Sequence, residues 1–237
     1  MLRSLKAYIP NTITCMNMLS GAIACVLSFH YSESFGSLLG YQWAFIFIGA
    51  AAIFDFCDGA AARLLKAYSD MGKELDSLSD LISFGLAPAL LMFNTINYFN
   101  GNVDALTPWA FAALYIVVIG GLRLAKFNVD DRQTTSFIGL PIPANAIFWI
   151  GTMAWMHAHG YIGNIPTLLL IFIVASLMVS RMRMFSLKFK NFEWRENFRR
   201  YVIIGAAILF VITEGVPGLA WTIILYILIS AVARKEA

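Results

Sequence analysis

Residues 55–80 place four aspartates, an arginine and two glycines between two strongly apolar stretches. The preceding run, YQWAFIFIGAAAIF, and the following run, LISFGLAPALLMF, are typical of helices that contact lipid. A charged side chain at membrane depth is costly, so it is kept where it faces a cavity or a partner. Four carboxylates also repel one another, and one arginine cannot neutralise them. The stretch therefore predicts a polar site inside a membrane protein.

The spacing of the carboxylates predicts two helices that face each other. Asp55 and Asp58 are three residues apart, and Asp76 and Asp80 are four apart, so each pair shares a helix face. Gly72 lies in the polar break KAYSDMGK and is expected to form the turn between the helices. Because Mg²⁺ binds through a few carboxylates together with substrate phosphate oxygens, we predict that the four aspartates hold divalent cations. A salt-bridge network between the helices is the alternative, but the stretch has few basic partners.

The composition predicts an all-α integral membrane protein. Of the 237 residues, 13% are charged and 59% are hydrophobic, whereas about 25% are charged in soluble domains. Eight apolar segments approach the ~20 residues that span the hydrocarbon. They cover approximately 12–31, 40–65, 74–97, 107–127, 142–158, 165–186, 198–213 and 216–233. We expect one membrane domain over 1–237, with the active site in a core at 1–190 and a C-terminal helical hairpin at 198–237.

The positions of the 17 Lys and Arg residues predict the orientation. The connections near 32–39, 98–106, 159–164 and 214–217 contain none of them, whereas the alternate connections and both chain ends are basic. By the positive-inside rule, both termini and the mouth of the acidic site face the cytoplasm. In residues 181–200, basic side chains interleaved with Phe and Trp suit an anionic membrane surface better than nucleic acid, because apolar segments bracket them.

The pattern D-x2-D-G-x2-A-R-x8-G-x3-D-x3-D, from Asp55 to Asp80, resembles the signature of the CDP-alcohol phosphotransferases. All eight specified residues are present. The resemblance implies a six-helix core, here followed by the C-terminal hairpin, and often a homodimer. It also implies two divalent cations, Mg²⁺ or Mn²⁺, and a role for Asp80 as the base that accepts the proton of the incoming hydroxyl.

The same resemblance implies contacts with a CDP-lipid. Arg63 can pair with phosphate oxygens, and the missing Cβ of Gly59 lets a ligand approach the backbone. Asn11, Thr14 and Asn17 stand at helical spacing, where they either cap and link helices or contact the nucleotide head group. The expected CDP-lipid contacts are Asn11, Thr14, Asp58, Gly59, Ala62, Arg63 and Gly72.

Four stretches outside the core motif resemble the phosphatidylserine synthase branch of this family: the Pro-Asn start at Pro10, DLISFGLAPALL, RLAKFN and GLPIPAN. This branch resemblance implies that L-serine attacks the lipid-linked phosphorus of CDP-diacylglycerol in a prokaryotic cell membrane and releases CMP. A serine site needs a cation for the carboxylate and a polar amide. The expected serine contacts are Arg123, Lys126, Asn128 and Asn145. Surface anchoring is the alternative for Lys126.

Two other functions stay open at this point. Another acceptor, such as glycerol 3-phosphate or an inositol phosphate, would keep the motif and change only the acceptor pocket. A divalent cation transporter would use the four acids as its ion site, but it would not need Gly59, Ala62 and Arg63 at fixed offsets. A purely structural scaffold leaves the acidic cluster unexplained.

Overall fold

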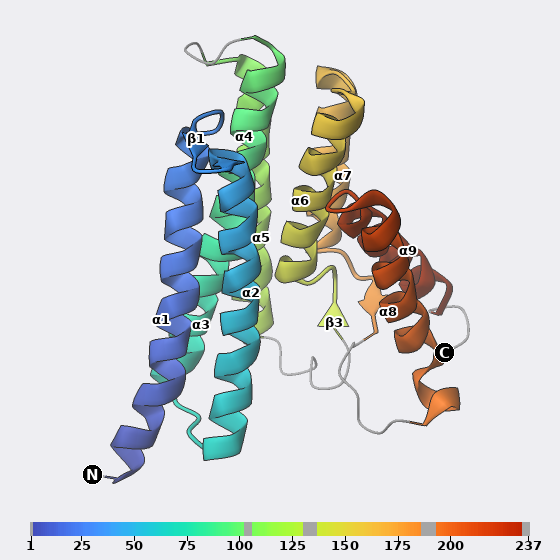
Figure 1. Ribbon diagram of the computed structural model, residues 1–237. Helices are drawn as coiled ribbons and strands as arrows, with labels where there is room; N and C mark the ends of the chain where they lie inside the picture. Colours follow the sequence, from blue (N-terminus) through green and yellow to red (C-terminus); the bar gives the residue numbers. More distant parts are fainter. Residues whose placement is uncertain (1, 102–105, 130–136, 186–192, 234–237) are drawn as a thin grey trace. The chain divides into compact units, whose positions relative to one another are not determined.

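The computed structural model describes residues 2–101, 106–129, 137–185 and 193–233. Its helices fall into two compact units, Met1–Leu124 and Ala125–Ala237, which are described separately (Figure 1). The expected division into a core at 1–190 and a hairpin at 198–237 stays a prediction. Five of the basic residues lie outside the described residues: Arg132, Lys188, Lys190, Arg234 and Lys235.

The first unit begins with two long helices that run side by side (Figure 1). Helix α1 (Leu2–Phe29) is joined to α2 (Gly40–Leu65) by a short hairpin of β1 (Ser34–Phe35) and β2 (Leu38–Leu39). The bounds of α2 are those expected from the apolar run at 40–65. Pro10, which precedes the apolar segment expected at 12–31, lies inside α1. A proline removes one backbone hydrogen bond from a helix, and α1 continues through it.

The turn after α2 corrects the expected role of Gly72. The chain reverses through Lys66, whose φ of 51° is left-handed, and Ser69 then caps α3 (Asp70–Asp80). Gly72 lies in the first turn of α3, where its N–H donates to the Ser69 side chain at 3.0 Å. A serine N-cap supplies an acceptor for an otherwise unpaired helix donor, so the polar break KAYSDMGK contains both the turn and the start of the helix.

Helix α3 continues into the π-helix η1 (Leu81–Leu86) and then α4 (Ala87–Phe99). Within this stretch, the Ala87 N–H donates to the Ile82 carbonyl, five residues earlier. Pro88 follows at the start of α4 and has no N–H to donate. The helix therefore makes a wider turn at Leu81–Leu86, directly after Asp80.

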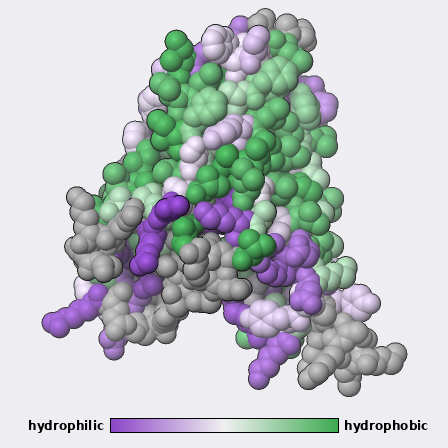
Figure 2. Space-filling view, turned by 180° about the vertical axis from the view of Figure 1, so that it is seen from behind, coloured by the Kyte–Doolittle hydropathy of each residue, from purple (hydrophilic) through white to green (hydrophobic). Residues whose placement is uncertain are grey.

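Four helical stretches among the described residues are long and apolar enough to cross a membrane: Tyr8–Phe29, Gly40–Leu65, Asp70–Phe99 and Pro108–Val129. The last consists of the 3-10 helix η2 (Pro108–Leu114) and α5 (Tyr115–Val129). Large apolar side chains point outward from these helices, as at Leu19, Val26 and Phe56. In Figure 2, hydrophobic residues cover much of the upper part of the visible face. The protein is therefore a helical membrane protein.

The second unit contains α6 (Ile142–His159), α7 (Asn164–Leu177), α8 (Trp194–Glu214) and α9 (Gly218–Ala233). Helix α9 packs against both α6 and α8. Short strands β3 (Phe137–Ile138) and β4 (Arg183–Met184) pair antiparallel.

The segment expected at 165–186 ends early, at Leu177. The N–H of Leu140 donates to the Leu177 carbonyl at 2.9 Å, and the N–H of Gly139 donates to the Met182 carbonyl at 2.8 Å. These bonds tie the chain after α7 to the segment between β3 and α6, so residues 183–184 form a strand instead of continuing the helix.

Candidate active site

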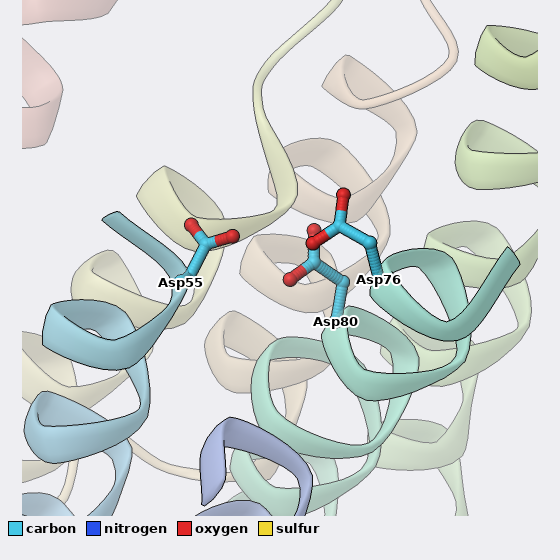
Figure 3. A group of neighbouring side chains, drawn as sticks. All are labelled: Asp55, Asp76 and Asp80. Atoms are coloured by element: carbon cyan, nitrogen blue, oxygen red, sulfur yellow. The ribbon is translucent and has the colours of Figure 1, made fainter. Parts of the chain in front are cut away.

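Three carboxylates from two helices meet at one point of the first unit. Asp55 comes from α2, whereas Asp76 and Asp80 lie one turn apart on α3 (Figure 3). One oxygen from each of the three lies within 4.8 Å of the others, and all three residues are half-buried. The spacing predicted that Asp76 and Asp80 share one helix face. Asp58, which was expected in the same cluster, is not one of the three.

This carboxylate cluster fits a hard cation. The Oδ1 atoms of Asp76 and Asp80 are buried and have no hydrogen-bond partner among the described residues. Carboxylate oxygens are the ligands that Mg²⁺ prefers, and they suit Mn²⁺ as well. A divalent cation would supply the countercharge that these buried oxygens lack.

Asp58, one turn after Asp55, is 5% exposed and is held by α1. The Thr14 hydroxyl lies 2.6 Å from Asp58 Oδ2 and 3.0 Å from the Pro10 carbonyl. One hydroxyl has one proton to donate, and the shorter distance to the charged acceptor favours Asp58. Thr14 therefore links α1 to α2, which is one of the two roles that the sequence left open for it.

A cavity of about 250 Å³ is lined in part by Asp58 and Asp76. Six of the seven expected CDP-lipid residues line it: Asn11, Thr14, Asp58, Gly59, Ala62 and Gly72. Tyr68 and Lys73 line it as well, although their sequence context did not single them out. The seventh residue, Arg63, is exposed, and its guanidinium lies close to Gly59, since a Cβ built there would be 3.7 Å from Nη1.

The expected serine contacts fall in both units. Arg123 is buried in the first unit, whereas Lys126, which is exposed, and Asn128, which is half-buried, follow on α5 in the second. Asn145 is fully buried near the start of α6, and its Oδ1 accepts a hydrogen bond from Trp149 Nε1 at 3.1 Å. Its Nδ2 has no partner in the described part of the chain. A shared serine site stays a prediction.

Two serines after Asp76 fasten α1 to the helix that carries the acids. Ser79 Oγ donates to the Thr14 carbonyl at 3.2 Å, and Ser83 Oγ donates to the Asn17 carbonyl at 3.0 Å. The sequence did not predict these links between helices. The four-residue spacing of the serines, one face of a helix, was the available signal.

A carboxylate cluster between apolar helices, next to a cavity lined by motif residues, is the arrangement expected of a membrane-embedded site for cations and phosphates. A family model for CDP-alcohol phosphatidyltransferases matches residues 7–232. The chain therefore belongs to this family of transferases, as the motif from Asp55 to Asp80 indicated.

Similar curated proteins from three organisms carry one name, CDP-diacylglycerol–serine O-phosphatidyltransferase. The Bacillus subtilis protein is 41% identical over 137 residues, which cover 57% of this chain and 70% of that protein. The Helicobacter pylori protein (strain 26695) is 33% identical over 207 residues, or 85% and 81% of the two chains. The Methanocaldococcus jannaschii protein is 34% identical over 151 residues, or 64% and 63%.

Proposed function

We propose that this protein transfers the phosphatidyl group of CDP-diacylglycerol to the hydroxyl group of L-serine, giving phosphatidylserine and CMP. The observation that carries the proposal is the convergence of Asp55, Asp76 and Asp80 beside a cavity that Asp58, Gly59, Ala62 and Gly72 line. The names of the Bacillus, Helicobacter and Methanocaldococcus relatives support serine as the acceptor.

Asp80 is the proposed base. In the overall reaction, the serine oxygen bonds to the lipid-linked phosphorus, the bond from that phosphorus to CMP breaks, and Asp80 accepts the hydroxyl proton. A positioned base of this kind contributes about 10²–10⁴-fold to a rate. Asp80 is half-buried at the C-terminal end of α3, where α1 and α2 hold the neighbouring groups in place.

The four motif aspartates are the proposed ligands of divalent cations, two ions of Mg²⁺ or Mn²⁺. Such ions, when bound, neutralise the diphosphate and stabilise the attacking and leaving oxygens. Gly59, Ala62 and Gly72 leave room in the cavity for the cytidine, and Arg63 pairs with the diphosphate.

The serine carboxylate requires a cation, for which Arg123 and Lys126 are proposed, with Asn128 and Asn145 as polar contacts. Charged pairs of this type are strong when they exclude water. The buried and unpartnered Nδ2 of Asn145, within the described residues, supports its candidacy as a donor.

The proposed topology has eight transmembrane helices, with both termini and the active site on the cytoplasmic side of a prokaryotic cell membrane. The absence of Lys and Arg from alternate connections of the sequence supports this orientation. We also propose that the protein acts as a homodimer, with residues 1–190 as the catalytic core and 198–237 as a peripheral hairpin.

The test is CMP release from CDP-diacylglycerol by purified protein with Mg²⁺ or Mn²⁺. L-serine is compared with glycerol 3-phosphate, an inositol phosphate and other alcohols, and the lipid product is identified. We expect CMP and phosphatidylserine to form with serine, and Asp80→Asn to lower the rate by about 10²–10⁴-fold.

The matched control is Asp70→Asn, which removes an exposed carboxylate from the first turn of the same helix and should retain activity. Release of CMP with a different alcohol would overturn serine as the acceptor and keep the reaction class. A folded protein that releases no CMP with any acceptor would instead favour a cation transporter.

A further inference from the structure

Asn17 is a buried amide that the fold leaves without a partner. It lies on α1 and is fully buried, yet neither its Oδ1 nor its Nδ2 has a hydrogen-bond partner among the described residues. Buried amides are almost always paired, so an unpartnered one needs an explanation. Ordinary packing would favour an apolar residue here, because burial of an amide without a hydrogen bond is unfavourable.

The Asn17 side chain lies against the carboxylate of Asp80. The Oδ1 atom of Asp80 is also buried without a hydrogen-bond partner within the described parts of the chain. A donor and an acceptor therefore stand next to each other, without a hydrogen bond of ordinary geometry between them in the described parts of the chain. Hydrogen bonds at active sites are often long in ligand-free structures and tighten when substrate binds.

Two contacts fix the backbone at Asn17. Its carbonyl accepts the hydrogen bond from Ser83 Oγ at 3.0 Å, so the residue is anchored to the helical stretch that carries Asp80. One turn further along α1, Gly21 allows η1 to approach very closely, because a Cβ there would lie 2.6 Å from the Cα of Ser83. Together, these contacts fix the position of the Asn17 amide along α1, beside the Asp80 carboxylate.

We propose that Asn17 is a positioning residue for the transfer reaction: its Nδ2 donates to the Asp80 carboxylate in the working site and fixes the orientation of that carboxylate. The inference rests on the proposed function, since it gives Asp80 the role of base. Groups that orient an active-site carboxylate in this way typically contribute 10–100-fold to metal affinity or activity.

The primary test is Asn17→Leu, which keeps the branched shape of the side chain and removes both polar atoms. We expect kcat to fall by about 10–100-fold and the Mn²⁺ dissociation constant, measured by electron paramagnetic resonance, to rise by a factor in the same range. The KM for CDP-diacylglycerol should change by less than about twofold, because the amide acts on Asp80 and not on the lipid. The melting temperature of the metal-free protein should hold or rise, since two unpartnered polar atoms leave the interior.

A purely structural amide predicts the opposite pattern: a lower melting temperature, with Mn²⁺ affinity and kcat unchanged. That pattern overturns the inference. The matched control is Asn94→Leu on α4, whose Nδ2 donates to the carbonyl of Leu90 in its own helix. It should leave both Mn²⁺ affinity and kcat at their wild-type values.

Asn17→Asp covers the case in which the leucine variant does not fold. It keeps the shape of the side chain and replaces the N–H donor by an acceptor, so kcat should again fall by at least about tenfold. Wild-type kcat in Asn17→Asp overturns the donor role. Mn²⁺ binding and melting need no substrate, so these two measurements test Asn17 even if the wild-type protein proves inactive with serine.

Discussion

Buried polar side chains near Tyr31 are paired, whereas several beside the carboxylate cluster of the same unit are not. The Tyr31 hydroxyl lies 2.8 Å from Thr95 Oγ1, which is itself 2.8 Å from the Leu91 carbonyl. Asn97 Oδ1 accepts from the Thr107 N–H at 2.9 Å, although the Thr107 hydroxyl is unpartnered among the described residues. Beside the cluster, four buried polar atoms lack a partner among the described residues: Oδ1 and Nδ2 of Asn17, Oδ1 of Asp76 and Oδ1 of Asp80.

The difference indicates what each region is for. A hydrogen bond between buried groups stabilises the fold by about 0.5–1.5 kcal/mol, whereas a buried group left unpaired costs about 1–3 kcal/mol. The region near Tyr31 therefore contributes to stability. The region near Asp80 lowers stability, and its unpaired groups are available to the proposed ions and substrate.

The largest effect in the acidic region, beyond the loss of Asp80 itself, is expected from Thr14→Val. The substitution removes the donor 2.6 Å from Asp58 and leaves a carboxylate that is 5% exposed without that bond. Hydrogen bonds to charged groups contribute about 1.5–3 kcal/mol, so kcat/KM for CDP-diacylglycerol should fall by about 10–100-fold. The control is Thr12→Val, whose exposed hydroxyl bonds only to the Tyr8 carbonyl of its own helix. Equal activity in the two variants would remove Thr14 from the site.

A smaller loss is expected from Gly72→Ala. The added Cβ would lie 3.0 Å from both Asn11 Oδ1 and Ser69 Oγ, so it would push the Asn11 amide out of its place in the cavity wall. Overpacking of this kind costs ~1 kcal/mol, or about a fivefold loss of kcat/KM. The matched control is Gly49→Ala in α2, where a Cβ has no neighbour within 4 Å in the described structure. It should stabilise the protein by about 0.5–1 kcal/mol, and a similar gain in Gly72→Ala would contradict the close approach.

Tyr31→Phe should have the smallest effect on activity and a measurable effect on stability. Because Thr95 already donates to the Leu91 carbonyl, the lost proton is that of the tyrosine. Unfolding by denaturant in detergent micelles should show a loss of about 0.5–1.5 kcal/mol, with kcat unchanged. A fall in kcat of more than twofold would mean that the two regions are coupled and would weaken the comparison.

The elements that follow from local chemistry could be predicted from the sequence. The apolar run at 40–65 gave the bounds of α2, and the spacing of Asp76 and Asp80 placed them on one face of α3. Fixed offsets in the motif were enough to bring Asp55 to the same point, because one hairpin connects the two helices.

Features that depend on tertiary contacts were missed. The turn after α2 was assigned to Gly72, although Ser69 caps α3 and Lys66 makes the reversal. Helix α7 ends at Leu177, whose carbonyl accepts a hydrogen bond from the N–H of Leu140, nearly 40 residues earlier. The unpartnered state of Asn17 was also invisible, since a sequence shows which groups are polar and not which of them lack a partner.

The π-helix Leu81–Leu86 has a consequence for how this chain is compared with its relatives. A π-turn inserts roughly one extra residue into a helix, and one residue corresponds to a rotation of about 100°. A helical wheel drawn at constant period through Asp70–Phe99 therefore loses its phase after Asp80. Faces assigned from the acidic half will point in the wrong direction around Leu91 and Thr95. A comparison of helix faces across the family must therefore assign the faces separately before and after the π-helix, which begins directly after Asp80, the proposed base.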